Sequence, residues 1–236
     1  MRYLTLCCDY DGTLATAGQI TSETLTALER LRSSGRKLLM VTGREIPDLK
    51  SVCPHLALFD LIVAENGALL YDPATQVQTA LAAPPPEKFT ATLRQRGVSP
   101  ISLGRVIVAT WEPHETVVLE TIRDLGLELQ VIFNKGAVMV LPAGINKATG
   151  LSAALARLRL QPENAVGVGD AENDHAFLAL CGCGVAVANA LSSLKDEADF
   201  VTRGDHGGGV AELIEELLRD DLASRTPRLR SVAARV

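Results

Sequence analysis

Two aspartates stand two residues apart, directly after an apolar run near the start of the chain. Residues 3–8 are apolar and rich in β-forming side chains, so they predict a buried strand, and Asp9 and Asp11 follow it. Side chains alternate along an extended chain, so both carboxylates would point to one side and could hold a common cation or phosphate group. Two like charges this close repel each other unless they share a cation. A solvated turn that leaves the strand is the alternative explanation for the pair.

Three further polar clusters lie where predicted elements end or begin. They are Thr42-Gly43-Arg44 after residues 37–41, Lys147 at the start of a helix over 147–158, and Asp170, Asn173 and Asp174 after residues 165–169. Each cluster alone has an ordinary explanation, because Thr and Asp cap helices and a lysine is usually a solvated surface cation. What the clusters do together depends on the elements that carry them.

Apolar, strand-like runs alternate with amphipathic segments in both halves of the chain. This alternation predicts an α/β fold with a Rossmann-like, doubly wound parallel sheet. The expected strands are residues 3–8, 37–41, 61–64, 165–169, 184–187 and 200–201, and the expected helices are 22–34, 147–158, 172–180 and one through 210–217. The glycine-rich stretch 204–209 is expected to be a flexible loop before the last helix. Parallel strands end on the same edge of a sheet, where ligands bind, so the polar clusters should meet there.

The pattern changes between the two halves. Residues 82–86, which end in three prolines, form a stiff linker, and residues 141–144 mark a second break. The enclosed residues predict an inserted α+β domain with helices at 86–96 and 113–125, strands at 105–110, 127–133 and 137–141, and a hairpin turn at 134–136. We therefore expect a core domain of residues 1–81 and 144–236 and a cap domain of residues 82–143.

Composition limits the partners that the chain can have. The chain has 236 residues, 47% of them hydrophobic, and a net charge of −5, which leaves no broad basic surface for nucleic acid. The apolar runs fall short of a membrane span, so we expect neither nucleic-acid nor membrane partners. The start has no signal-peptide pattern and the five cysteines form no disulfide framework, which favours the cytoplasm. The arginine-containing tail 223–236 is expected to be a frayed terminus, and nothing predicts the oligomeric state.

Four short motifs carry a family resemblance. DYDGT from Asp9, VTGR ending at Arg44, Asn146-Lys147 and GDAEND from Gly169 resemble, in this order, the four motifs of the haloacid dehalogenase-like phosphohydrolases. The insertion between the second and third motifs is similar to that of the Cof-type and sucrose-phosphatase-like branch, which has a large α+β cap and includes archaeal-type phosphoglycolate phosphatases. The insertion here is on the short side for that branch.

The resemblance implies a role for each motif residue. Asp9 would be the nucleophile and Asp11 the general acid and base. Mg²⁺ would be held by Asp9, the main-chain carbonyl of Asp11 and Asp170, while Asp174 orients a metal-bound water. The phosphate contacts would come from Gly12, Thr42, Gly43, Lys147 and Asn173. Arg44 would either touch the substrate beyond the phosphate or pair with a helix carboxylate.

The function implied by the resemblance is hydrolysis of a small phosphate monoester through an aspartyl-phosphate, with Mg²⁺ as cofactor. The substrate would be a sugar phosphate or a phosphoglycolate-like phosphoacid. A phosphomutase or phosphotransferase of the same fold, and a regulatory protein that binds a phosphate ligand without turnover, are the alternatives. Specificity would come from the cap, where the candidates are Arg105, Trp111, His114, Asn134 and Lys135. The histidines His55, His114 and His175 are not needed for the proton transfers, which Asp11 would carry out.

Overall fold

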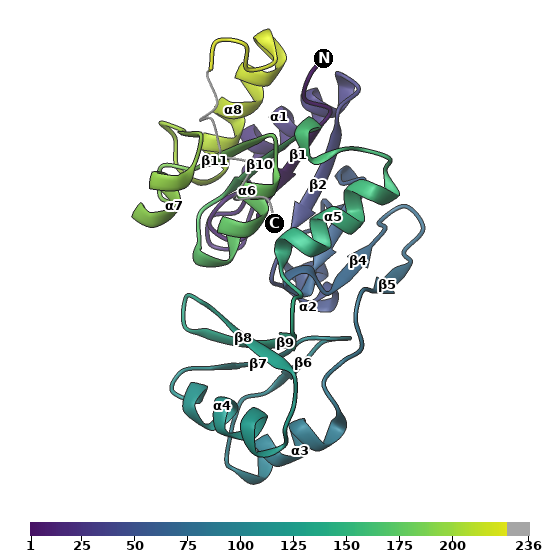
Figure 1. The fold of residues 1–236 in the computed structure, drawn as a ribbon. Coiled ribbons are helices and arrows are strands. Elements are labelled where there is room, and N and C mark those ends of the chain that lie inside the picture. Colours follow the sequence, from purple (N-terminus) through teal and green to yellow (C-terminus); the bar gives the residue numbers. More distant parts are fainter. Residues whose placement is uncertain (226–236) are drawn as a thin grey trace.

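The computed structural model of the chain describes residues 1–225 and places them in two units, each built on its own sheet (Figure 1). In the larger unit eight strands follow the order β12-β11-β10-β1-β2-β3-β4-β5. Their bounds are β1 Thr5–Cys8, β2 Lys37–Val41, β3 Leu61–Ala64, β4 Leu69–Tyr71, β5 Gln78–Ala80, β10 Ala165–Gly169, β11 Cys183–Ala186 and β12 Phe200–Val201. The helices of this unit are α1 Ser22–Ser33, α2 Ile46–Val52, α5 Lys147–Arg157, α6 His175–Leu180, α7 Ser192–Glu197 and α8 His206–Asp220. Short 3₁₀ turns lie at Leu56–Leu58, Glu65–Gly67, Pro162–Asn164 and Glu172–Asp174.

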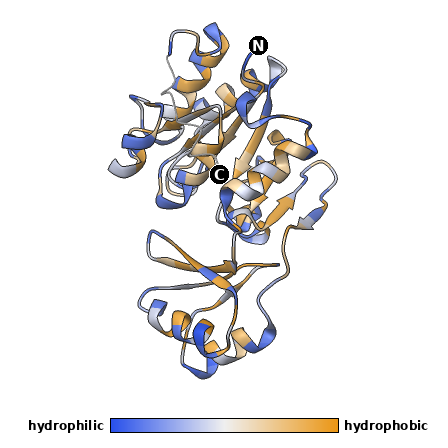
Figure 2. Ribbon diagram, in the orientation of Figure 1, coloured by the Kyte–Doolittle hydropathy of each residue, from blue (hydrophilic) through white to orange (hydrophobic). Residues whose placement is uncertain are grey.

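The centre of the larger sheet is parallel and buried on both faces. Strands β12, β11, β10, β1, β2 and β3 pair in parallel in that order. By the usual right-handed crossover between parallel strands, α1 and α2 belong on one face and α6 and α7 on the other. Consistent with this, α8 packs on α1 and α5 packs on α6. Figure 2 shows the hydrophobic residues gathered in the strands between these helices. The predicted doubly wound α/β core is confirmed.

The far edge of the larger sheet is antiparallel, which the sequence did not predict. β4 pairs antiparallel with β3, and β5 pairs antiparallel with β4. The reversal is made at Asn66 and Gly67, which both have left-handed backbone angles, φ +55° and φ +107°. A Cβ on Gly67 would lie 1.9 Å from the carbonyl oxygen of Asn146, so the turn also needs glycine to pack against the start of α5.

The glycine-rich stretch 204–209 is not the flexible loop that was expected. α8 begins at His206, so three consecutive glycines form its first turn. A Cβ on Gly207 would lie 2.3 Å from Oγ1 of Thr24 in α1, and one on Gly209 would lie 2.4 Å from the carbonyl oxygen of Gly204. Gly207 therefore lets α8 approach α1 closely, and Gly209 lets the helix start pack against the chain before it. The prediction was wrong because loop composition alone does not reveal such close contacts.

The smaller unit is a four-stranded antiparallel sheet with two helices on one face. Its strands lie in the order β6-β7-β9-β8. The elements are α3 Glu87–Gln95, β6 Ser102–Leu103, β7 Val108–Trp111, α4 Glu115–Asp124, β8 Leu129–Asn134 and β9 Ala137–Pro142. Val108, Val138 and Val140 pack under the helices with Phe89 and Leu93. These elements lie inside residues 82–143, which we keep as the proposed bounds of the cap.

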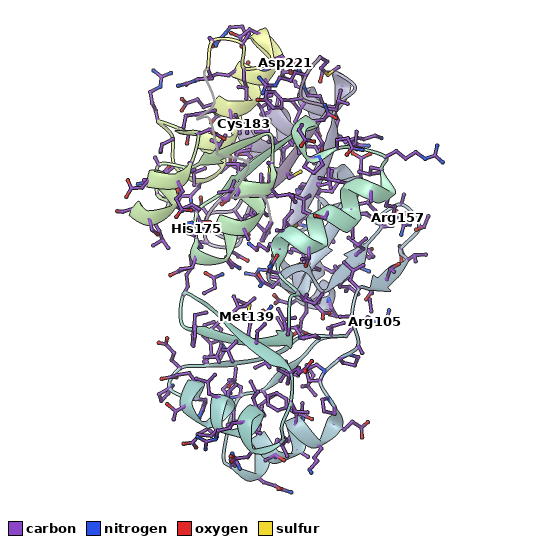
Figure 3. All side chains as sticks on the ribbon, viewed as in Figure 1. Arg105, Met139, Arg157, His175, Cys183 and Asp221 are labelled. Carbon is purple, nitrogen blue, oxygen red and sulfur yellow. The ribbon has the colours of Figure 1, made fainter. Side chains whose placement is uncertain are left out.

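Strand alternation gives the smaller sheet a second face, directed at the larger unit. Ala109, Trp111, Ala137 and Met139 alternate with the valines that pack under the helices, and they line the space between the units. Figure 3 shows Met139 on that side of β9. The smaller sheet therefore forms a roof over the edge of the larger one.

Two observations concern the chain as a whole. No helix within residues 1–225 is both long and apolar enough to span a membrane. The predicted frayed tail lies largely outside the described residues, and Arg225, its last described residue, pairs with Glu216 in α8 through two hydrogen bonds.

Candidate active site

The strand ends bring the predicted polar clusters to one edge of the larger sheet. Asp9 follows β1, Thr42 follows β2 and Asp170 follows β10, and these three strands are neighbours. Lys147 is the first residue of α5, whose start is fixed by a capping box between Asn146 and Thr149. Separate segments of the chain thus converge because each ends or begins at the same sheet edge.

The centre of this edge is a buried group of carboxylates around one ammonium. Oxygens of Asp9, Asp170 and Asp174 lie within 4.8 Å of one another, and all three residues are buried. Lys147 is 1% exposed, and its Nζ donates to Oδ1 of Asp9 at 2.5 Å and to Oδ1 of Asp174 at 2.6 Å. Burial alone would lower the pKa of Lys147, but the two carboxylates outweigh it, so this pKa is raised and the ammonium stays charged.

Asp174 shapes the loop that presents Asp170. Its Oδ2 accepts hydrogen bonds from the backbone N–H groups of Asp170 and Ala171, at 2.8 and 2.9 Å. The hydroxyl of Thr13 donates to Oδ1 of Asp170 at 2.7 Å. Both oxygens of Asp174 thus have protein partners, and the Oδ2 atom of Asp170 remains directed toward the cap residue Lys135, 2.8 Å away.

Asp11 lies apart from this buried group, at the mouth of the space under the cap. Its carboxylate is held by Arg44 through a two-pronged contact of 2.6 and 2.8 Å. The same guanidinium donates to Asp48 of α2 at 2.6 Å. Arg44 therefore does pair with a helix carboxylate, and it also lines the cavity described below.

The remaining predicted phosphate contacts lie on the segments that meet at the same sheet edge as Asp9. Thr42 is buried, and its hydroxyl accepts from the backbone N–H of Arg44 at 3.1 Å. Gly12 has φ +94°, and a Cβ there would lie 2.4 Å from Oδ2 of Asp170, so only glycine fits. A Cβ on Gly43 would lie 3.9 Å from Nδ2 of Asn173, which places these two predicted residues side by side.

The donor set fits a hard divalent cation. The oxygens of Asp9 and Asp170 and the main-chain carbonyl of Asp11 are the kind of ligand that Mg²⁺ prefers. Burial raises the pKa of Asp9, and the carboxylates of Asp174 and Asp170 raise it further against the opposing effect of Lys147. An additional cation would favour the ionised form of Asp9, so the charge balance of the group also suits a metal.

A cavity of about 750 Å³ lies between the units and reaches this carboxylate group. The larger unit contributes Asp9, Asp11, Gly43, Arg44, Glu45 and Asp48. The cap contributes residues 100–102, Ile107, Ala109, Thr110, Trp111, Asn134, Lys135, Ala137 and Met139. Of the five cap candidates predicted for specificity, Trp111, Asn134 and Lys135 are among these lining residues. Arg105 and His114 are not.

Sequence reasoning missed Glu65, which joins the two units. Its carboxylate is 1% exposed and accepts three hydrogen bonds from consecutive cap amides, those of Arg105, Val106 and Ile107, at 2.8, 2.8 and 2.9 Å. These amides are therefore not available to a sheet, which explains why β7 begins at Val108 rather than at 105 as expected. The only signal in the sequence was an acidic residue at the end of β3.

Two other polar residues near the site also had no predicted role. Nδ2 of Asn173 donates to Oδ1 of Asn66 at 2.9 Å, so Asn66 fixes the predicted phosphate ligand. Nδ1 of His206 lies 2.8 Å from the carbonyl oxygen of Gly12, at the turn that carries Asp9 and Asp11. The other histidines considered, His55, His114 and His175, do not line the cavity.

Comparison with known proteins gives concordant matches. A model of the haloacid dehalogenase-like hydrolases matches residues 6–103 and 130–214. Phosphoglycolate phosphatase from Methanothermobacter thermautotrophicus is 29% identical over 217 residues, which are 89% of this chain and 96% of that protein. Phosphoglycolate phosphatase from Haloarcula marismortui is 30% identical over 220 residues, 87% of this chain and 93% of that one.

The fold has solved counterparts as well. A haloacid dehalogenase-like hydrolase from Bacteroides thetaiotaomicron has a TM-score of 0.80 at 21% identity, over 91% of this chain and 99% of that chain. The residues matched by the family model include every strand end and helix start that carries Asp9, Thr42, Lys147 and Asp170. On this match the chain belongs to the haloacid dehalogenase-like hydrolases.

Proposed function

We propose that this hydrolase is a magnesium-dependent phosphatase that cleaves a small phosphate monoester through an aspartyl-phosphate on Asp9. The observation that carries the proposal is the placement of Asp9, which is held by Lys147 at 2.5 Å and lines a cavity whose mouth carries Asp11. The proposed nucleophile and the proposed proton donor thus line one cavity, and Lys147 holds a positive charge beside the nucleophile.

The proposed reaction has two steps. In the first, a carboxylate oxygen of Asp9 bonds to phosphorus, the bond from phosphorus to the ester oxygen breaks, and Asp11 gives a proton to that oxygen, which leaves as an alcohol. In the second, Asp11 takes a proton from water, whose oxygen bonds to phosphorus. The bond between Asp9 and phosphorus then breaks, which releases inorganic phosphate and restores Asp9.

The other residues of the edge would bind and orient the phosphoryl group. Lys147 carries a fixed positive charge beside Asp9, and the hydroxyl of Thr42 and the backbone N–H of Gly43 would supply hydrogen-bond donors. The backbone N–H of Gly12, also predicted as a phosphate contact, donates to the carbonyl of Ala15 at 3.1 Å and would have to leave it to bind phosphate. Asn173 would contribute its side-chain amide. Mg²⁺, held by Asp9, Asp170 and the Asp11 carbonyl, would supply further positive charge to the phosphate oxygens. Asp174 would keep Lys147 and the Asp170 loop in place.

The substrate class proposed is a short phosphoacid such as phosphoglycolate, with sugar phosphates as the second class. The two relatives above are named phosphoglycolate phosphatases, which supports the first class. A cavity of about 750 Å³ is larger than phosphoglycolate needs, so partial closure of the cap over the ester would accompany binding.

The test is phosphate release from a panel of monoesters, measured with Mg²⁺ and with EDTA. The panel contains phosphoglycolate, several sugar phosphates and p-nitrophenyl phosphate. We expect metal-dependent release that Asp9→Asn abolishes, because an amide is a poor nucleophile. Release by Asp9→Asn at the parent rate, or no release from any ester, would refute the proposed function.

A further inference from the structure

Lys135 links the cap to the edge of the larger sheet. It lies in the turn between β8 and β9, with φ +50°. Its Nζ donates to Oδ2 of Asp170 at 2.8 Å and to the main-chain carbonyl of Asp11 at 2.9 Å. A lysine side chain is protonated at neutral pH, so the cap delivers a charged ammonium to these two oxygens.

These two oxygens are also in the set assigned above to Mg²⁺. An ammonium and a divalent cation repel each other, and both would draw on the same two acceptors. Lys135 and the metal therefore compete for them. When the metal is bound, the ammonium needs another partner.

The displaced ammonium of Lys135 can turn into the cavity. The side chain of Lys135 is 52% exposed and already lines the cavity. The other cation among the described lining residues is Arg44, whose guanidinium is bound to Asp11 and Asp48. Turning Arg44 toward a ligand would break its ion pairs with Asp11 and Asp48 inside the larger unit. Lys135 has no ion pair of that kind among residues 1–225, so it is the cation that can turn to a ligand.

We propose that Lys135 determines specificity by binding an anionic group, a carboxylate, on the alcohol portion of the substrate, and that Mg²⁺ releases it for this role by taking the oxygens of Asp170 and Asp11. The proposal rests on the proposed phosphatase function. It accounts for an ammonium that reaches the catalytic edge from the cap.

The first test needs no substrate. Mg²⁺ is titrated by isothermal calorimetry into the parent protein, Lys135→Met, and the control Lys88→Met, an exposed lysine of α3. Loss of the competing ammonium should lower the Mg²⁺ dissociation constant of Lys135→Met by ~10-fold, and Lys88→Met should match the parent. An unchanged or weaker affinity in Lys135→Met would overturn the competition.

The second test compares two esters of nearly equal size, phosphoglycolate and 2-hydroxyethyl phosphate, of which only the first carries a carboxylate. A hydrogen bond to a charged group predicts that Lys135→Met loses ~10- to 100-fold in kcat/KM for phosphoglycolate, mainly through KM, and less than ~3-fold for the neutral ester. Lys135→Arg should recover part of the loss.

The outcomes separate the two proposals. Equal losses on both esters would place Lys135 on the phosphoryl group and overturn its role in specificity, while the phosphatase function stands. A parent protein that hydrolyses neither these esters nor any other in the panel would overturn the phosphatase function, and the role of Lys135 with it.

Discussion

Replacing Glu65 with glutamine should loosen the contact between cap and core without unfolding either unit. The carboxylate accepts one cap N–H on Oε1 and two on Oε2. In Glu65→Gln the amide oxygen can keep two of these donors with neutral hydrogen bonds, while the new NH₂ group faces the third donor. The substitution adds no volume, so the effect is electrostatic.

The magnitude follows from these three contacts. Charge-assisted hydrogen bonds are about twice as strong as neutral ones, so weakening two of them costs ~2 kcal/mol. The third donor loses its acceptor, which costs a further ~1 kcal/mol or more because the site is nearly dry. A total of ~3 kcal/mol corresponds to a ~10²-fold larger open fraction of the cap loop.

Hydrogen–deuterium exchange measures that open fraction directly. Exchange of the Val106 and Ile107 amides should rise by ~10²-fold in Glu65→Gln, since these N–H groups have no other acceptor among residues 1–225. The matched control is Glu45→Gln, whose carboxylate accepts from the exposed hydroxyl of Ser102 at the rim of the same interface. We expect that control to stay within ~3-fold of the parent.

Two results would refute this reasoning. Unchanged exchange at Val106 and Ile107 would mean that the carboxylate does not secure the cap loop. An equal rise in β2 and β3 would mean that the substitution destabilises the whole larger unit rather than the contact.

The remaining predictions concern the buried charges. Lys147→Met should lower the free energy of unfolding in EDTA, measured with urea, by ~3–5 kcal/mol because it strands two buried carboxylates; adding Asp174→Asn should recover part of this loss. Asp11→Asn should lose ~10²- to 10⁴-fold in kcat, more for alkyl than for aryl phosphates, and equal losses would exclude its acid role. Partial burial alone would raise the pKa of Asp221, but the hydrogen bond and charge of Arg36, together with the backbone N–H groups of Arg2 and Tyr3, outweigh it and hold that pKa below its ordinary value. Its contribution to stability should therefore be complete above pH ~4 and fade as the pH falls through the folded-state pKa, and Asp221→Asn should remove this acid-side loss from a stability–pH profile.

Much of the core could be predicted because its signals are local. β2 and β3 have the predicted bounds, since each is an apolar run ended by polar residues. The same rule placed Asp9 and Asp170 at one edge, because parallel strands all end on the same side. The roles assigned to these residues remain predictions, as they came from the family resemblance.

What could not be predicted depends on contacts between distant segments. Glu65 and the amides that it binds are about forty residues apart, and nothing in the residues themselves signals a backbone partner. Lys135 was one of five cap candidates, and only the fold of the β8–β9 turn brings it to Asp170. Gly207 suggested a loop because its need for close packing appears only when α8 meets α1.

The Glu65 contact also bears on how such a cap could diversify. Because Glu65 binds only main-chain N–H groups, the larger unit does not depend on the identity of the cap side chains at this joint. This contact does require a glycine at position 104, because a Cβ on Gly104 would lie 2.6 Å from the carboxyl carbon of Glu65. An exposed residue such as Trp111 could therefore change from one descendant to another without weakening the docking. A chimaera that carries a foreign cap should assemble if its chain offers the same three amides after a glycine.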